Sequence, residues 1–239
     1  MVPTKSLIPL ICTLLLFSTT LPADDYLQQR QALMAEIQQD ATGLRDGKFS
    51  ARTMSAMGRV PRHEFVSARL RNKAYKNRPL SIGHGQTISQ PFIVALMTDL
   101  LAISPGDKVF ELGTGSGYQA AVLAELGADV YSMEIVEPLG LAAAQRLKRL
   151  NYTNVRVEVA DGYHGWPDAA PFDAIIVTAA GDHIPTPLIQ QLKPGGRMVL
   201  PVGGRYLVQQ LILVTRSEDG MLLTQNILPV AFVPLTGNH

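Results

Sequence analysis

From about residue 108 onward, short apolar runs alternate with amphipathic stretches along this chain. The apolar runs have the length of strands buried on both faces, and the stretches between them are typical of helices. Because strands and helices alternate, we expect a doubly wound, mostly parallel α/β sheet covered on both faces. The pattern predicts strands at 108–112, 129–134, 155–159, 173–178 and 197–202, and helices near 117–127, 137–150 and 185–192.

The two ends of the domain have different patterns. Apolar, β-branched runs at 207–215 and 227–232 flank a turn-like stretch at 217–220, which predicts an antiparallel hairpin at the edge of the sheet. Helical spacing of apolar residues predicts an N-terminal helix over 25–39 and a second helical stretch at 50–57.

Residues 80–90 contain no helical period and two glycines, and Pro91 is suited to the first turn of a helix at 92–102. We therefore expect one domain over 24–237. Its parts are N-terminal helices with a substrate-side loop (24–91), a cofactor-binding core (92–202) and a C-terminal hairpin (203–237).

The first residues are typical of a secretory signal peptide. Lys5 precedes an uncharged stretch from Ser6 to Ala23, which two prolines interrupt and which is short for a membrane-spanning helix. We expect export, with cleavage near Ala23 and no stable membrane span afterwards. The only cysteine, Cys12, lies in this segment, so no intramolecular disulfide can form.

Charge and histidine placement exclude some classes of function. The 21 basic and 20 acidic residues give a net charge of +1, which argues against a nucleic-acid-binding protein. The five histidines are scattered without the spacing of metal ligands, so we expect no catalytic metal.

A glycine-rich turn follows the first core strand. Glu111 is followed by three alternating glycines at 113, 115 and 117, and glycine lets a ligand lie almost against the backbone. A dinucleotide-binding turn would place its third glycine at position 118, which is a tyrosine here. The compressed spacing resembles the first motif of class I methyltransferases, which bind S-adenosylmethionine.

Other strands also end in polar residues at the edge where a nucleoside would bind. An acid after the second strand can accept hydrogen bonds from ribose hydroxyls, and an Asp-Gly pair after the third suits an adenine edge. The predicted cofactor-binding residues are Glu111, Gly113, Thr114, Gly115, Ser116, Gly117, Glu134, Asp161, Gly162 and Thr178.

Five segments together resemble the protein-L-isoaspartate O-methyltransferase family, over roughly residues 34–237. They lie at 60–66, 81–91, 111–119, 171–180 and 230–235, and Gln-Thr-Ile-Ser-Gln-Pro at 86–91 is specific to that family. The resemblance implies a Rossmann-like methyltransferase fold and methyl transfer from S-adenosylmethionine to the α-carboxylate of L-isoaspartyl residues in damaged proteins and peptides. Ser89 matches the family's active-site serine, and Thr87 is expected to assist.

Two other functions remain open: a methyltransferase of the same fold that acts on another carboxylate, and a nucleoside-binding module without turnover. We expect a monomer. Most family members lack an export signal and begin near the position of Met34, so a cytoplasmic form that starts at Met34 is the alternative to a periplasmic one.

Overall fold

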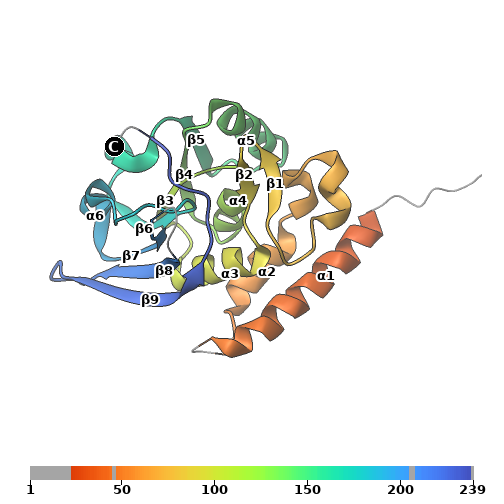
Figure 1. Cartoon of the computed structure of the whole chain (residues 1–239), viewed down its shortest axis with the longest axis horizontal. Coiled ribbons are helices and arrows are strands. Elements are labelled where there is room, and N and C mark those ends of the chain that lie inside the picture. Colours follow the sequence, from red (N-terminus) through yellow and green to blue (C-terminus); the bar gives the residue numbers. More distant parts are fainter. Residues whose placement is uncertain (1–22, 45–46, 205–207, 238–239) are drawn as a thin grey trace, which may run out of the picture.

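A mixed sheet forms the centre of the computed structural model, which describes residues 23–44, 47–204 and 208–237 (Figure 1). The sheet has seven strands within these ranges, in the order β5-β4-β3-β6-β7-β8-β9. The strands are β3 (Lys108–Leu112), β4 (Asp129–Glu134), β5 (Val155–Val159), β6 (Phe172–Val177), β7 (Leu192–Val202), β8 (Gln209–Arg216) and β9 (Leu222–Val230).

The helices precede and connect these strands. They are α1 (Ala23–Asp40), α2 (Ala51–Arg59), α3 (Pro91–Leu100), α4 (Tyr118–Glu125), α5 (Glu137–Arg149) and α6 (Thr186–Gln191). Short 3-10 turns lie at Ala41–Gly43, Arg62–Phe65, Ala68–Lys73, Gly162–His164 and Pro167–Ala169. Ser50 caps α2 by accepting a hydrogen bond from the Thr53 amide, and Pro91 occupies the first turn of α3, as the sequence predicts.

Strand order places the ligand-binding edge of the sheet. From β3 the chain proceeds outward through β4 to β5, and then returns to β6 on the other side of β3. The strand pairings among β3, β4, β5, β6 and β7 are all parallel, so the carboxyl ends of these strands lie at the same edge of the sheet. The order reverses between β3 and β6, and ligands bind preferentially at such a switch point.

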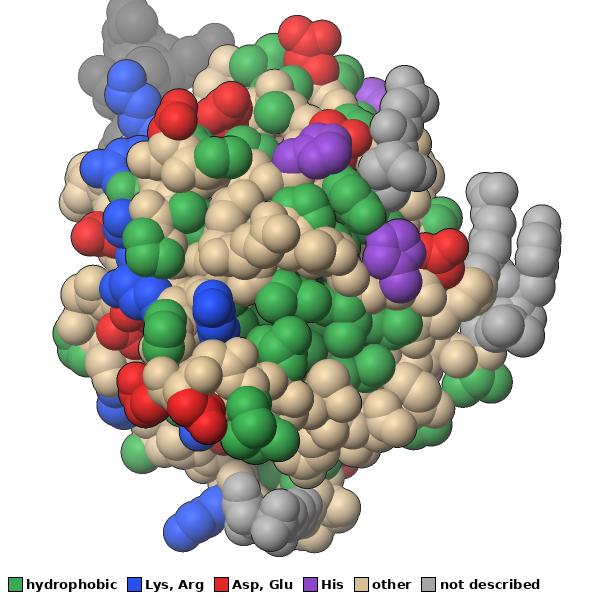
Figure 2. Space-filling view, turned by 90° about the vertical axis from the view of Figure 1, so that its left-hand side faces the viewer, with side chains coloured by type: hydrophobic (Ala, Val, Ile, Leu, Met, Phe, Trp, Pro, Cys, Tyr) green, Lys and Arg blue, Asp and Glu red, His purple; other side chains and the backbone are tan. Residues whose placement is uncertain are grey.

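Both faces of the sheet are covered, as the continuous apolar runs indicate. Val109 and Ile176 belong to the larger core, with residues of α1 to α4, whereas Phe110 and Ile175 face a second core that includes Leu188 of α6. The doubly wound, mostly parallel fold is thereby confirmed. Figure 2 shows the side of the molecule at the left of Figure 1, where hydrophobic side chains form the centre of the face.

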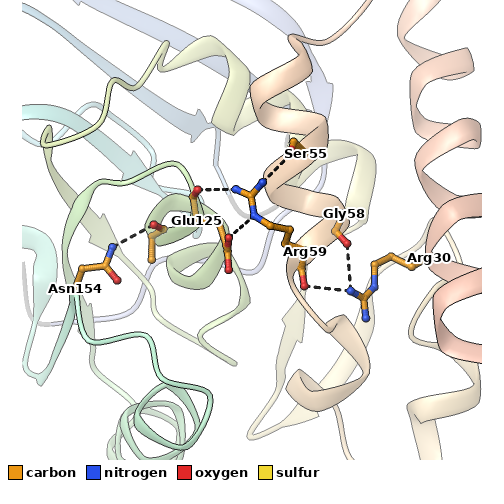
Figure 3. A network of polar contacts seen from close by, with 7 residues as sticks. Arg30, Ser55, Gly58, Arg59, Glu125 and Asn154 are labelled. Atoms are coloured by element: carbon orange, nitrogen blue, oxygen red, sulfur yellow. Dashed lines mark hydrogen bonds and ion pairs between the residues drawn. The ribbon is translucent and has the colours of Figure 1, made fainter. Parts of the chain in front are cut away.

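Helix α1 belongs to this folded unit. Arg30 donates hydrogen bonds of 3.1 Å to the carbonyls of Gly58 and Arg59, and Arg59 pairs with Glu125 of α4 (Figure 3). Leu33 of α1 is 2% exposed and packs in the larger core. The predicted signal segment at 1–23 lies outside the described residues, apart from Ala23, where α1 begins.

Three segments differ from the pattern-based expectation. Within residues 80–90, β1 (Leu80–Gly83) and β2 (Gln86–Ile88) form a small antiparallel hairpin. These strands, of four and three residues, are too short to show an alternating pattern in the sequence. Strand β7 begins at Leu192 rather than 197 because a bulge accommodates the Pro-Gly-Gly stretch in its pairing with β6. Strand β9 spans Leu222–Val230 rather than 227–232, since its first half lies exposed at the sheet edge and lacks a buried face.

Among the residues that the structure describes, no helix is both long enough and apolar enough to cross a bilayer.

Candidate functional site

The glycine turn connects β3 to α4 at the switch point of the sheet. The strand ends at Leu112, and Gly117 precedes the first residue of α4, Tyr118, as the sequence predicts. Gly113, Gly115 and Gly117 have φ angles of +98°, +53° and +85°. These values lie in the left-handed region, where a side chain is disfavoured, so the backbone geometry requires the glycines.

Gly113 is also in close contact with Thr178, which directly follows β6. A Cβ on Gly113 would lie 2.3 Å from the Thr178 hydroxyl oxygen. That hydroxyl donates a hydrogen bond of 2.6 Å to the Gly113 carbonyl, across the carboxyl ends of β3 and β6. Thr178 therefore fixes the position of the glycine turn.

Glu134, at the end of β4, holds the other side of the turn. One carboxylate oxygen accepts the Gly115 amide at 2.7 Å, and the other accepts the Val136 amide at 2.9 Å. A carboxylate has about four lone-pair positions, so these two bonds leave capacity for ligand hydroxyls. The predicted ribose contact is compatible with this arrangement and stays a prediction.

The carboxyl ends of the strands line a cavity, here called the inner cavity. Seven of the residues predicted to bind the cofactor or to act in catalysis line this cavity, and so does the segment that follows β9. The lining residues are Gln86, Thr87, Leu112, Gly113, Gly115, Met133, Glu134, Ile135, Val136, Asp161, Gly162, Thr178, Ala179, Val233, Pro234, Leu235 and Thr236. A Cβ on Gly162 would lie 2.8 Å from Leu112 Cγ, so this position needs glycine for packing.

The inner cavity fits the parts of a nucleoside sulfonium ligand. Glu134 offers a carboxylate where a ribose would lie, and Met133 and Ile135 supply apolar surface for a purine ring. The glycines permit a close approach of the ligand to the turn. The residues present thus suit S-adenosylmethionine.

A second depression, the outer groove, opens beside the inner cavity. It is lined by Pro79, Thr87, Ser89, Gln90, Ile93, Thr178 and residues 229–233. A smaller connecting hollow lies between Ser89 and the glycine turn, and Thr114, Ser116 and Tyr118 also line it. Thr87 and Thr178 border all three spaces, so they mark the passage from the groove to the turn.

Ser89 follows β2 and lies half-buried at this junction. It lines both the outer groove and the connecting hollow. Ile82 of the same hairpin lies over the turn, since its Cδ1 would be 3.4 Å from a Cβ on Gly115. The hairpin therefore presents Ser89 toward the groove next to the glycine turn.

Glu111 lies apart from the three spaces. Its side chain is fully buried, and one oxygen lies 2.5 Å from the Ser132 hydroxyl, which in turn lies 2.6 Å from the Thr114 hydroxyl. The other oxygen is buried and has no hydrogen-bond partner within the described part of the chain. Burial raises the pKa of Glu111 to about 8, and the nearby Glu134 adds to the increase while Ser132 opposes it. This geometry favours support of the turn from behind over direct ligand contact.

Several lining residues were missed by the sequence reasoning. Gln86 and Ile135 border the inner cavity, as does the tail at Val233–Thr236. Hydrogen bonds tie this tail to the end of β6, from the Ala180 amide to the Val233 carbonyl and from the Leu235 amide to the Ala180 carbonyl. The resemblance of residues 230–235 to the family could have pointed to the tail, but it did not indicate that the tail lines a cavity.

The chain was compared with protein-family models and with known proteins. The model described as protein-L-isoaspartate(D-aspartate) O-methyltransferase (PCMT) matches residues 28–239. The match begins ahead of Met34 and so includes part of α1.

Relatives of high identity carry related names. Protein-L-isoaspartate O-methyltransferase 2 of Polaromonas sp. is 65% identical over 188 residues, which are 79% of this chain and 89% of the relative. Protein-L-isoaspartate O-methyltransferase 1 of Nitrosospira multiformis is 54% identical over 228 residues, or 95% of each chain.

Solved structures agree with the fold. A protein-L-isoaspartate O-methyltransferase superposes with a TM-score of 0.78 at 29% identity, covering 87% of this chain and 66% of that one. A β-aspartate methyltransferase from Plasmodium falciparum, solved in complex with S-adenosyl-L-homocysteine, has a TM-score of 0.72 at 24% identity, covering 87% of this chain and 99% of that one. The family match and the two relatives show that this chain belongs to the protein-L-isoaspartate(D-aspartate) O-methyltransferase family.

Proposed function

We propose that this protein is a repair methyltransferase that transfers a methyl group to the α-carboxylate of L-isoaspartyl residues in damaged proteins and peptides. The bound S-adenosylmethionine supplies an electrophilic methyl group. The observation that carries the proposal is the placement of Ser89, which lines both the outer groove and the connecting hollow beside the glycine turn. A substrate in the groove would present its carboxylate there.

Methyl transfer to a carboxylate needs no strong general base. A carboxylate has a pKa of about 4 and is already ionised at neutral pH. What the protein must supply is orientation, which brings the carboxylate oxygen into line with the methyl group. The Ser89 hydroxyl can donate a hydrogen bond to the carboxylate, and Thr87, on the same hairpin, lies beside it in the groove.

The cofactor would be held by the residues around the inner cavity. We assign the ribose to Glu134, the adenine edge to Asp161 and Gly162, and the methionine part to the glycine turn with Thr178. Thr114 and Ser116 border the connecting hollow, on the side toward Ser89. Glu111 would act by supporting the turn.

Methyl transfer to a matched pair of peptides tests this function. The peptides differ only in containing isoaspartate or aspartate, and the methyl donor is radiolabelled S-adenosylmethionine. Label only in the isoaspartyl peptide is the expected result. Equal labelling of both would indicate action on other carboxylates, and labelling of neither would indicate a nucleoside-binding module without turnover.

We further propose that residues 1–23 direct export to the periplasm and that the mature protein is a monomer. Cell fractionation with sequencing of the mature N-terminus tests the first proposal, and a cytoplasmic form beginning at Met34 would contradict it. Analytical ultracentrifugation tests the second, and a dimer would contradict it.

A further inference from the structure

Arg62 is a fully buried cation next to the proposed active site, and the reaction outlined above does not use it. Its exposed fraction is 0%, and no carboxylate pairs with it among the described residues. A buried charge is costly unless hydrogen bonds compensate it. The groups that the Arg62 guanidinium contacts therefore indicate the role of this buried charge.

The guanidinium joins three separate segments. Its Nε donates a hydrogen bond of 2.9 Å to the Ala74 carbonyl, and its Nη2 donates one of 2.8 Å to the Ser89 carbonyl. Its central carbon lies 4.7 Å from the centre of the Tyr118 ring, which allows a cation–π contact. Tyr118 directly follows the glycine turn, so one planar group connects the backbone of Ser89 to the cofactor side.

The third nitrogen of the guanidinium makes this arrangement costly. Nη1 of Arg62 is buried without a hydrogen-bond partner in the described residues. An unsatisfied buried donor costs about 1–3 kcal/mol. An apolar side chain would avoid that cost but could not hold the Ser89 carbonyl.

We propose that Arg62 is a positioning residue, which fixes the Ser89 hydroxyl relative to the methyl donor through the Ser89 backbone. The inference rests on the proposed function. A lysine at position 62 keeps the charge and the aliphatic stem, but its ammonium cannot bind two carbonyls in one plane while it stacks on a ring. Arg62→Lys therefore tests positioning, and Arg62→Met tests removal of the cation.

Arg216→Lys is the matched control. Arg216 also donates to a backbone carbonyl, that of Leu192 at 2.6 Å, but it lies on β8 and lines none of the three spaces of the site. For each variant the measurements are kcat and KM for the isoaspartyl peptide, calorimetric affinity for S-adenosylhomocysteine, melting temperature, and amide exchange at Ser89 and Gln90.

Arg62→Lys is expected to lower kcat by about tenfold, as the loss of one hydrogen bond to a charged group would, and to change the affinity for S-adenosylhomocysteine less than about threefold. Exchange at Ser89 and Gln90 should become faster, and Arg216→Lys should leave kcat within about twofold. An unchanged kcat in folded Arg62→Lys would overturn the proposal. A parallel loss of kcat, affinity and melting temperature, or failure of both Arg62 variants to fold, would also overturn it in favour of a structural role.

A wild-type protein that methylates neither peptide would refute the proposed function instead. In that case amide exchange still decides whether Arg62 holds the Ser89 backbone. Faster exchange in Arg62→Lys, confined to Ser89 and Gln90, would support this contact, and unchanged exchange would contradict it.

Discussion

The Thr178 hydroxyl oxygen occupies the space that a Cβ on Gly113 would need, at 2.3 Å from the position of that carbon. We therefore expect Gly113→Ala to destabilise the protein and to abolish measurable binding of S-adenosylhomocysteine. The positive φ alone costs about 1–2 kcal/mol, and the contact with Thr178 adds to it. Thermal denaturation and calorimetry provide the measurement.

Two further variants separate the contact from the backbone strain. Gly220→Ala has a similar φ, +87°, but a Cβ there meets nothing within 4 Å, so it reports the strain alone. Adding Thr178→Ala to Gly113→Ala removes the obstructing oxygen and should restore part of the stability. A double variant no more stable than Gly113→Ala would contradict this explanation.

Ser89→Ala is expected to reduce methyl transfer while nearly preserving cofactor binding. A hydrogen bond to a charged group contributes about 1.5–3 kcal/mol, which corresponds to a loss of about ten- to a hundredfold in kcat/KM. Ser81→Ala, on the same hairpin but outside the three spaces, serves as the control. Equal activity of Ser89→Ala and wild type on an isoaspartyl peptide would exclude the role.

Glu134→Gln is expected to weaken cofactor binding. Both carboxylate oxygens accept backbone amides, and the NH₂ of glutamine would place a donor against one of them. The loss of one charge-assisted bond, about 1.5–3 kcal/mol, predicts an increase of at least about tenfold in the dissociation constant of S-adenosylhomocysteine. Glu137→Gln, in the first turn of α5, is the control, and equal affinities of the two variants would contradict the assignment.

The buried carboxyl of Glu111 predicts a pH-dependent stability. Its pKa is raised from 4.5 to about 8 in the folded protein, so the folded state holds the proton more tightly than the unfolded state. Its contribution to stability is complete below pH 4.5 and is lost as the pH rises to about 8. The loss is about 1.4 kcal/mol per pH unit within that window.

Glu111→Gln cannot ionise, so it should lack this loss. Denaturation between about pH 5 and pH 9 should show the variant gaining stability relative to wild type as the pH rises. A difference that stays constant with pH would show that Glu111 is ionised in the folded protein.

A chain beginning at Met34 is expected to be less stable than one beginning at Ala23. It would lose buried Leu33 and the Arg30 hydrogen bonds to Gly58 and Arg59. Loss of a buried leucine alone costs about 2–5 kcal/mol. At about 2–4 °C per kcal/mol, the melting temperature should fall by at least about 4 °C. Equal melting temperatures of the two chains would contradict the expectation that a start at Met34 lowers stability.

Local sequence patterns predicted much of the fold. The strands at 108–112 and 129–134 match β3 and β4, which are mostly buried. The strand at 155–159 matches β5, an edge strand whose valines alternate with charged residues, as in a half-buried strand. The pattern was misleading at β9, whose first half lies exposed at the edge of the sheet. There the pairing with β8, rather than burial, maintains the strand.

The sequence by itself predicted the glycine turn, because glycine adopts positive φ without the strain that other residues would have there. Tertiary structure decided which distant residues meet there. Thr178 against Gly113, the tail at 233–236 over the inner cavity, and Arg62 between Ser89 and Tyr118 depend on chain packing, and no local pattern encodes them. Residue types and spacing specify local backbone geometry, whereas contacts across many residues arise only when the sheet edge brings the segments together.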